Sequence, residues 1–133
     1  MTDAIAREAT AGELASVLGI LDGAALETGT DRVRAGIERG DVLVAVPDDR
    51  AGSGGADATP VGALVLDGDE IASIAVRRRR RGQGIGTALV EAAADRREAL
   101  VAECDADVRP FYESLGFETE PVGDGRYRGR RDS

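Results

Sequence analysis

The chain has 133 residues with a formal net charge of −8, one cysteine and no histidine, and all of its 17 basic residues are arginine. This length fits one domain around a single core, and the lack of histidine excludes a Ser-His-Asp triad and the commonest metal ligand. The single Cys104 excludes an internal disulfide, and no apolar run approaches the roughly 18 residues that a membrane-spanning helix needs, so we expect a cytoplasmic protein with no membrane partner.

The first half of the chain predicts a strand, two helices and three further strands. Apolar residues recur at helical spacing after Thr10, a candidate N-cap residue, and a second short helix is expected between Asp31 as its cap and Gly40 as its end. Residues 47–60 are rich in Gly, Asp, Ala and Pro, and we expect them to form a mobile loop. In chain order the strands are expected at residues 5–9, 42–46, 61–66 and 70–76, with a hairpin turn before the last.

The second half predicts an alternation of helices and strands. Apolar residues from Ile85 onward fall on one helix face, and a later helix begins near Pro110 and ends at Gly116. The remaining strands are expected at residues 99–104, 117–122 and 126–130, and residues 129–133 are expected to be a tail. The whole order, βααβββαβαββ, predicts a single mixed α/β domain over residues 1–133 with one central sheet.

The sequence RRRRRGQGIGT stands between the strand at 70–76 and the next helix, with glycines at positions 82, 84 and 86. Glycine lets the backbone approach a ligand closely, and the free N–H groups at a helix start favour an anion. The stretch therefore indicates a pyrophosphate-binding loop. Two other nucleotide-binding patterns do not fit, because the dinucleotide fingerprint needs a glycine where Leu89 stands and the mononucleotide P-loop needs a lysine.

The pattern Arg81-x-x-Gly84-x-Gly86 after an apolar strand resembles the acyl-CoA pyrophosphate motif of the GCN5-related N-acetyltransferases. The sequence FYESLGF, at residues 111–117, is similar to a second segment of that family, and the resemblance runs from residue 5 to about residue 127. It implies the acyl-CoA N-acyltransferase fold, in which helices flank a mixed, mostly antiparallel sheet. It also implies a metal-free enzyme that transfers the acetyl group of acetyl-CoA to a primary amine by direct attack in a ternary complex.

The resemblance also implies where acetyl-CoA binds. A V-shaped split is expected between the strands at 70–76 and 99–104, in which the pantetheine pairs with the backbone of Ile74 and Val76. Two roles remain for the arginines at 77–80. They either form a solvated connector or contact the phosphates of the cofactor. Nucleic-acid binding is disfavoured by the net charge of −8 and the aromatic content of 3%. The pyrophosphate is expected on the backbone of Arg81, Gly82, Gly84, Ile85, Gly86 and Thr87.

Two residues are candidates for the chemistry. Tyr112 matches the tyrosine that the family places near the thioester sulfur as general acid, although a tyrosine at the edge of the core gives the same pattern. Glu70 stands eleven residues before Arg81, as the general base does in the histone-acetylating branch of the family, although DGDE is also an ordinary acidic turn. Glu103 and Asp105 remain alternatives that would act through a water molecule.

Three questions stay open at the level of sequence. A non-catalytic acyl-CoA-binding regulatory or sensor domain is the alternative to an enzyme, and such a domain would show no amine-dependent release of thiol. The acceptor is a small molecule or a protein amine, and homodimers are common in the family without being indicated here. The acidic, lysine-free composition is typical of proteins from halophilic archaea, while a GC-rich genome that prefers arginine codons would give the same arginine bias.

Overall fold

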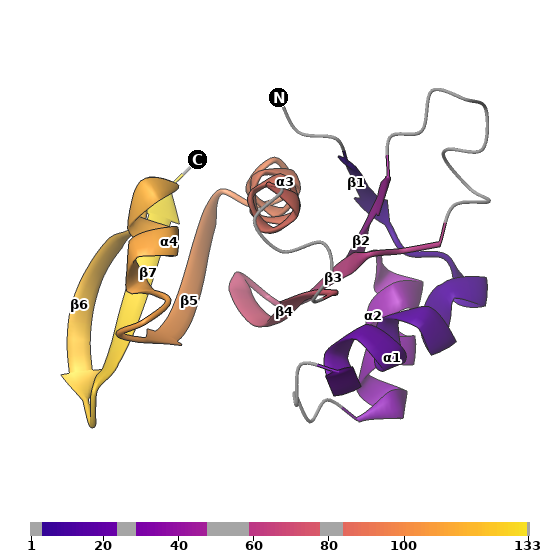
Figure 1. Cartoon of the computed structure of the whole chain (residues 1–133), viewed down its shortest axis with the longest axis horizontal. Helices are drawn as coiled ribbons and strands as arrows, with labels where there is room; N and C mark the ends of the chain where they lie inside the picture. The colour runs from indigo at the N-terminus through magenta and orange to yellow at the C-terminus, as the bar shows by residue number, and fades with distance from the viewer. Residues whose placement is uncertain (1–3, 24–28, 48–58, 78–83, 133) are drawn as a thin grey trace.

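The computed structural model describes residues 4–23, 29–47, 59–77 and 84–132. Within these residues the elements follow the predicted order, and seven strands form one sheet in the order β1-β2-β3-β4-β5-β7-β6 (Figure 1). Every neighbouring pair is antiparallel except β4 and β5, which are parallel, so the expected mixed, mostly antiparallel sheet flanked by helices is confirmed. The elements are β1 (Ala4–Glu8), the 3-10 turn η1 (Ala11–Glu13), α1 (Leu14–Gly23), α2 (Thr30–Arg39), β2 (Val42–Pro47), β3 (Gly62–Asp67), β4 (Glu70–Val76), α3 (Ile85–Ala94), β5 (Ala99–Asp105), α4 (Arg109–Ser114), β6 (Glu118–Gly123) and β7 (Arg126–Asp132).

The helix boundaries in the first half differ from the expected ones at a single cap. Thr10 precedes the first helical turn as expected, and Gly40 ends α2 in the left-handed conformation with φ +78°. α2 begins at Thr30 with Gly29 as its N-cap residue, so the expectation that Asp31 caps the helix is wrong. Asp31 instead lies in the first turn, where its negative charge faces the positive end of the helix dipole.

The expected tail at residues 129–133 is also wrong, because residues 129–132 continue β7 to Asp132, which is in register with Ala99 at the start of β5. Gly129 is buried against Phe117, where a Cβ would lie 3.4 Å from the Phe117 ring, while the arginines on either side of it are exposed. This alternation is that of a strand with one packed face. Of the expected mobile loop, residues 48–58 lie outside the described residues.

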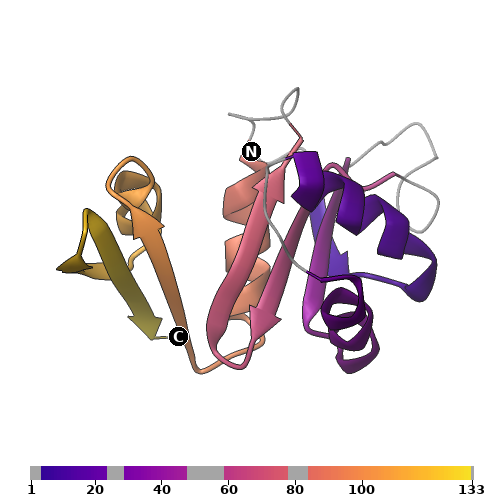
Figure 2. The same ribbon diagram turned by 90° about the horizontal axis from the view of Figure 1, so that it is seen from below.

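The central strands β2 and β3 are covered on both faces, by α1 and α2 on one side and by α3 on the other (Figures 1 and 2). Side chains alternate along β2, so that Leu43 packs in the core beneath α3 while Val42 and Val44 pack beneath α1 and α2. This double burial explains the unbroken apolar runs of β2 and β3, since neither face of the sheet meets water. No helix among the described residues is long and apolar enough to span a membrane.

The strands β4 and β5 meet at one point and then separate. Glu70 is in register with Val101, whose N–H donates to the carbonyl oxygen of Asp69 at 2.9 Å. No second register pair joins the two strands within the described residues, and Figure 2 shows them diverging from that end. The V-shaped split that the resemblance implied is therefore confirmed. It divides the molecule into a first half, β1–β4 with α1–α3, and a second half, β5, β7 and β6 with α4.

Candidate active site

The edge of β4 that faces the split is set by a β-bulge. β4 pairs with β3 first as Ile71 with Leu66 and then as Ser73 with Val65, so Ala72 is an extra residue on β4. A bulge changes which residues of a strand turn toward each neighbour. It allows β4 to bond β5 at its start and to present a different set of backbone groups farther along.

Beyond the bulge, alternate residues of β4 turn toward β3 and toward the split. The N–H of Arg77 donates to the carbonyl of Val61 at 2.8 Å, so residues 73, 75 and 77 face β3. The backbone groups of Ile74 and Val76 therefore point to the β5 side, and their side chains pack against the core beneath α3. This orientation suits pairing between the backbone of β4 and an extended chain in the split.

The arginine run is described at its first member only. Besides its backbone bond, Arg77 donates from Nε to the carbonyl of Pro60 at 3.3 Å, which ties the end of β4 to the start of β3. Arg77 is therefore held by protein carbonyls on the β3 side. Arg81 and Gly82, which we expect at the pyrophosphate, lie with residues 78–80 outside the described residues.

The helix α3 begins beside the open end of the split. Its N-cap residue is Gly84 with φ +80°, a backbone conformation that favours glycine. The first bond within the helix runs from the N–H of Ala88 to the carbonyl of Gly84 at 3.0 Å. The N–H groups of Ile85, Gly86 and Thr87 accordingly have no acceptor inside the helix, and with the helix dipole they make a site that suits an anion.

The first two residues of α3 also contact neighbouring elements. Ile85 is buried against β3, where a Cβ on Gly62 would lie only 2.9 Å from the Cγ2 atom of Ile85. A Cβ on Gly86 would lie 3.3 Å from Cζ of Phe111 in α4, so the ring of Phe111 rests against the bare backbone of α3. Position 84 thus favours glycine because of its backbone conformation, and position 86 favours glycine because the Phe111 ring lies close to it. The spacing of the glycines in the sequence did not show this difference.

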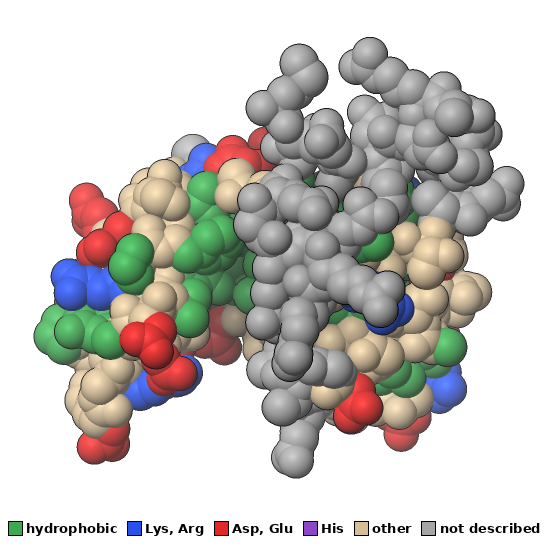
Figure 3. Space-filling model, viewed as in Figure 1, with side chains coloured by type: hydrophobic (Ala, Val, Ile, Leu, Met, Phe, Trp, Pro, Cys, Tyr) green, Lys and Arg blue, Asp and Glu red, His purple; other side chains and the backbone are tan. Residues whose placement is uncertain are grey.

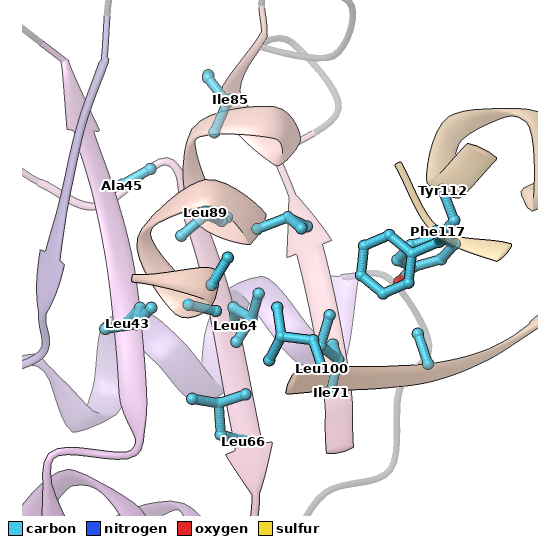
Figure 4. Packing of buried hydrophobic residues seen from close by; sticks show 14 of the residues in the cluster. Leu43, Ala45, Leu64, Leu66, Ile71, Ile85, Leu89, Leu100, Tyr112 and Phe117 are labelled. Atoms are coloured by element: carbon cyan, nitrogen blue, oxygen red, sulfur yellow. The ribbon is translucent and has the colours of Figure 1, made fainter. Parts of the chain in front are cut away.

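Tyr112 lies in the core on the α4 side of the split. The residue is 4% exposed, and its ring stands between those of Phe111 and Phe117 in edge-on contacts with centroid distances of 5.1 Å each. Figure 4 shows Tyr112 and Phe117 on one side of the split and Leu64 and Leu89 on the other. Burial raises the pKa of Tyr112 to about 12, so the phenol is protonated throughout the neutral pH range.

The three candidate bases lie on the opposite face of the sheet. Along β5, Glu103 and Asp105 are exposed and alternate with buried residues that pack toward α4. Nη1 of Arg128 lies 2.9 Å from Oε2 of Glu103 and 4.0 Å from Oε2 of Glu70, while Asp105 has its own ion pair with Arg126 at 2.8 Å. Of the three carboxylates, Glu70 therefore has the longest contact to a guanidinium group.

Comparison with known proteins identifies the family. Residues 38–119, more than half of the chain, match the family model described as an acetyltransferase (GNAT) domain. The chain belongs to the GNAT acetyltransferase family. It is accordingly an acetyl-CoA-dependent N-acetyltransferase with acetyl-CoA as co-substrate, and the alternative of a non-catalytic binding domain is not favoured. No curated protein sequence matches the chain at a significant level.

Solved structures show the same GNAT fold at low sequence identity. A GNAT acetyltransferase from Bacillus cereus is 12% identical with a TM-score of 0.79, covering 98% of this chain and 97% of that one. Ard1 from Thermoplasma volcanium is 20% identical with a TM-score of 0.73, over 98% and 97% of the two chains. PaiA N-acetyltransferase from Thermoplasma acidophilum, solved in complex with coenzyme A, is 14% identical with a TM-score of 0.73, over 98% and 99%.

Several residues of the expected site lie along the split in the described part of the GNAT domain. Ile74, Val76 and the first turn of α3 border the split on one side, and Tyr112 lies across it. Figure 3 shows hydrophobic side chains gathered between α4 and α3, beside the residues drawn in grey. Sequence reasoning missed Phe111 and Arg128, because their contacts join segments that are far apart in the chain. Among the described residues, no group of three or more His, Cys, Asp or Glu side chains is arranged to hold a metal ion.

Proposed function

We propose that residues 1–133 form one GNAT domain that transfers the acetyl group of acetyl-CoA to a primary amine, with Tyr112 and Glu70 acting from opposite faces of the sheet. The single observation that carries this proposal is the split itself, which opens beside the helix start of α3 and has a buried phenol on one face and carboxylates on the other. Direct attack needs both reactants present together, and a split bordered by both groups can hold them.

The cofactor side of the proposal rests on backbone groups. The backbone of Ile74 and Val76 would pair with the two amides of pantetheine, and the N–H groups of Ile85, Gly86 and Thr87 would bind the pyrophosphate. Arg81, Gly82 and Gly84 belong to the same loop by the family pattern. The residues present fit the ligand, because the α3 start offers several N–H donors and Gly84 at its N-cap carries no side chain beside them.

The acceptor side of the proposal is the exposed face of β5, β7 and β6. A hollow of about 460 Å³ lies there, lined by residues 101, 118–120 and 128–130. Val101, in its lining, is the residue in register with Glu70. An amine bound in this hollow would therefore reach the split next to the Glu70 carboxylate. Small amines and protein amines both remain acceptors under this proposal.

The chemistry then divides between the two residues. The amine nitrogen forms a bond to the acetyl carbon and loses one proton to Glu70, directly or through a water molecule. The C–S bond breaks as the thiolate departs, and the Tyr112 phenol donates a hydrogen bond to that sulfur. Burial raises the pKa of the Tyr112 phenol to about 12, and thiols are stronger acids than such a phenol, so complete proton transfer to the departing thiolate is uphill. Hydrogen-bond donation during C–S cleavage is therefore the main contribution assigned to Tyr112.

The test is amine-dependent release of CoA thiol, followed with a thiol-reactive chromophore across a panel of small amines and peptides. The protein's own background is low, because its single thiol, Cys104, is buried and burial raises the pKa of that thiol. Saturable, amine-dependent release supports the proposal. Tight binding of acetyl-CoA with no release by any acceptor would instead favour a sensor domain.

The composition supports two further parts of the proposal. A chain with 25 acidic residues, no lysine and one cysteine suits the cytoplasm of a salt-accumulating halophile, such as a halophilic archaeon. Excess carboxylates keep such a surface hydrated at high ionic strength. The assay is therefore best run over a range of KCl concentrations, and sedimentation under the same conditions distinguishes a monomer from a homodimer.

A further inference from the structure

The protein places all of its aromatic residues around one short helix. The chain has two phenylalanines, two tyrosines and no tryptophan. Phe111 and Tyr112 belong to α4, Phe117 directly precedes β6, and Tyr127 lies in β7. Elsewhere the core is built from aliphatic side chains. Aromatic rings have few rotamers and defined contact geometries, so this clustering indicates that the position of α4 is tightly specified.

One side of α4 is fixed against the strands of the second half. Nε of Arg109 donates to Oγ1 of Thr119 at 2.9 Å and to Oε2 of Glu113 at 3.0 Å, and its guanidinium carbon lies 4.5 Å from the centre of the Tyr127 ring. These contacts tie the first turn of α4 to β6 and β7. A helix of only six residues has little stability by itself, so its position depends on such contacts.

The other side of α4 faces α3 across the split through Phe111. The ring of Phe111 lies against Gly86, where a Cβ would come within 3.3 Å of Cζ and 3.5 Å of Cε1. The same ring makes the edge-on contact with Tyr112. Phe111 is therefore the spacer between the helix turn proposed to bind pyrophosphate and the phenol proposed to meet the sulfur.

We infer that Phe111 is a positioning residue, which sets the location of the Tyr112 phenol relative to the first turn of α3. This inference rests on the proposed function, because it assumes that the phenol acts on the departing sulfur. Pyrophosphate and sulfur are the two ends of one cofactor arm, so the distance between their binding groups has to match the length of that arm. An aromatic ring wedged on a glycine fixes this distance more rigidly than an aliphatic side chain would.

A double-mutant cycle tests the inference. Gly86→Ala adds a methyl group to the helix at 3.3 Å from the Phe111 ring, so the ring and Tyr112 have to move by a few tenths of an ångström. We expect kcat to fall about 10-fold with the KM for acetyl-CoA nearly unchanged, since small misplacements of catalytic groups act on the chemical step. In the Phe111→Leu background, where the shorter side chain leaves room for the methyl group, Gly86→Ala should cause no additional loss of kcat.

Two other outcomes of the cycle would overturn the inference. If Gly86→Ala raises the KM for acetyl-CoA equally in both backgrounds and leaves kcat alone, Gly86 serves only the approach of the pyrophosphate. If it changes neither constant in either background, the contact with Phe111 positions nothing. Thermal unfolding of all four proteins ensures that only folded variants are compared.

A spectroscopic readout separates this inference from the proposed function. In a Tyr127→Phe background, Tyr112 is the sole tyrosine, and without tryptophan the near-ultraviolet circular dichroism above about 275 nm reports on its surroundings. Gly86→Ala should change that signal when Phe111 is present and leave it unchanged with Phe111→Leu. If the signal responds in this way while Tyr112→Phe retains full activity, the positioning contact stands and the role proposed for the phenol falls. An equal response in both backgrounds contradicts the positioning role itself.

Discussion

Replacement of Gly84 by valine should abolish acetyl-CoA binding while reducing stability by a modest amount. Gly84 has φ +80° at the N-cap of α3, and a side-chain-bearing residue in the left-handed region costs roughly 1–2 kcal/mol, with a β-branched residue at the upper end. The Cβ would also stand beside the N–H groups that we expect to bind the pyrophosphate. Acetyl-CoA at a concentration of 100 times its Kd should raise the free energy of unfolding of the wild type by about 2.7 kcal/mol. For a domain of this size, that gain raises the Tm by roughly 10 °C.

The measurement is a thermal scan with and without acetyl-CoA, combined with calorimetric titration at a temperature where the variant is folded. Gly84→Asn is the matched control, because asparagine tolerates the left-handed conformation and is a good N-cap residue. It should restore most of the lost stability and little of the lost binding, since it still carries a Cβ. A folded Gly84→Val protein that keeps the full shift in Tm would refute the assignment of this turn as the pyrophosphate site.

Three further predictions concern stability and the support of α4. The guanidinium of Arg7 donates to both carboxylate oxygens of Glu13 at 2.8 Å and holds the pKa of Glu13 below its ordinary value of 4.5. The pair therefore stabilises the fold above that pH. This contribution is lost as the pH falls through the lower pKa of the folded state. Acid titration of unfolding should therefore show a steeper loss of stability in the wild type than in Glu13→Gln. The Tm should rise from dilute buffer to molar KCl, because salt screens repulsion among the excess carboxylates, and a flat or falling curve would argue for codon bias over halophilic adaptation. Arg109→Met should lower kcat about 5-fold with little change in the KM for acetyl-CoA, Thr119→Val should cost less, and an effect on KM alone would contradict the role of this contact in holding α4.

Most of the fold was accessible from periodicity in the sequence. The apolar runs of β2 and β3 and the glycines that end α2 and α4 mark elements locally, because each signal depends on neighbouring residues only. The prediction of a tail at residues 129–133 was wrong because the strand there depends on a non-local contact. The strand predicted at residues 126–130 continues through the polar residues 131 and 132, because these pair with β5, and no local pattern indicates that pairing.

The motifs of the candidate site were predictable from the sequence, whereas the contacts between its distant residues were not. Glycine spacing indicated an anion-binding helix start, and the FYESLGF segment placed Tyr112 near it by resemblance. The contact between Gly86 and Phe111, and the Arg128 guanidinium near Glu70 and Glu103, join residues separated by tens of positions. Such pairs follow from the approach of Phe111 to the start of α3 and from the pairing of β5 with β7, so they become visible only once the sheet order is known.

The most direct test of the account is the effect of Tyr112→Phe on the two constants of one reaction, kcat at saturating acetyl-CoA and Kd for acetyl-CoA. Phenylalanine keeps the edge-on packing with Phe111 and Phe117 and removes only the hydroxyl group. We predict a fall in kcat on the order of 10²-fold with Kd changed by less than about 2-fold, because the phenol acts on the sulfur as the C–S bond breaks. A variant that binds acetyl-CoA more weakly and turns over at the wild-type rate when saturated would contradict the central claim and make Tyr112 a packing residue.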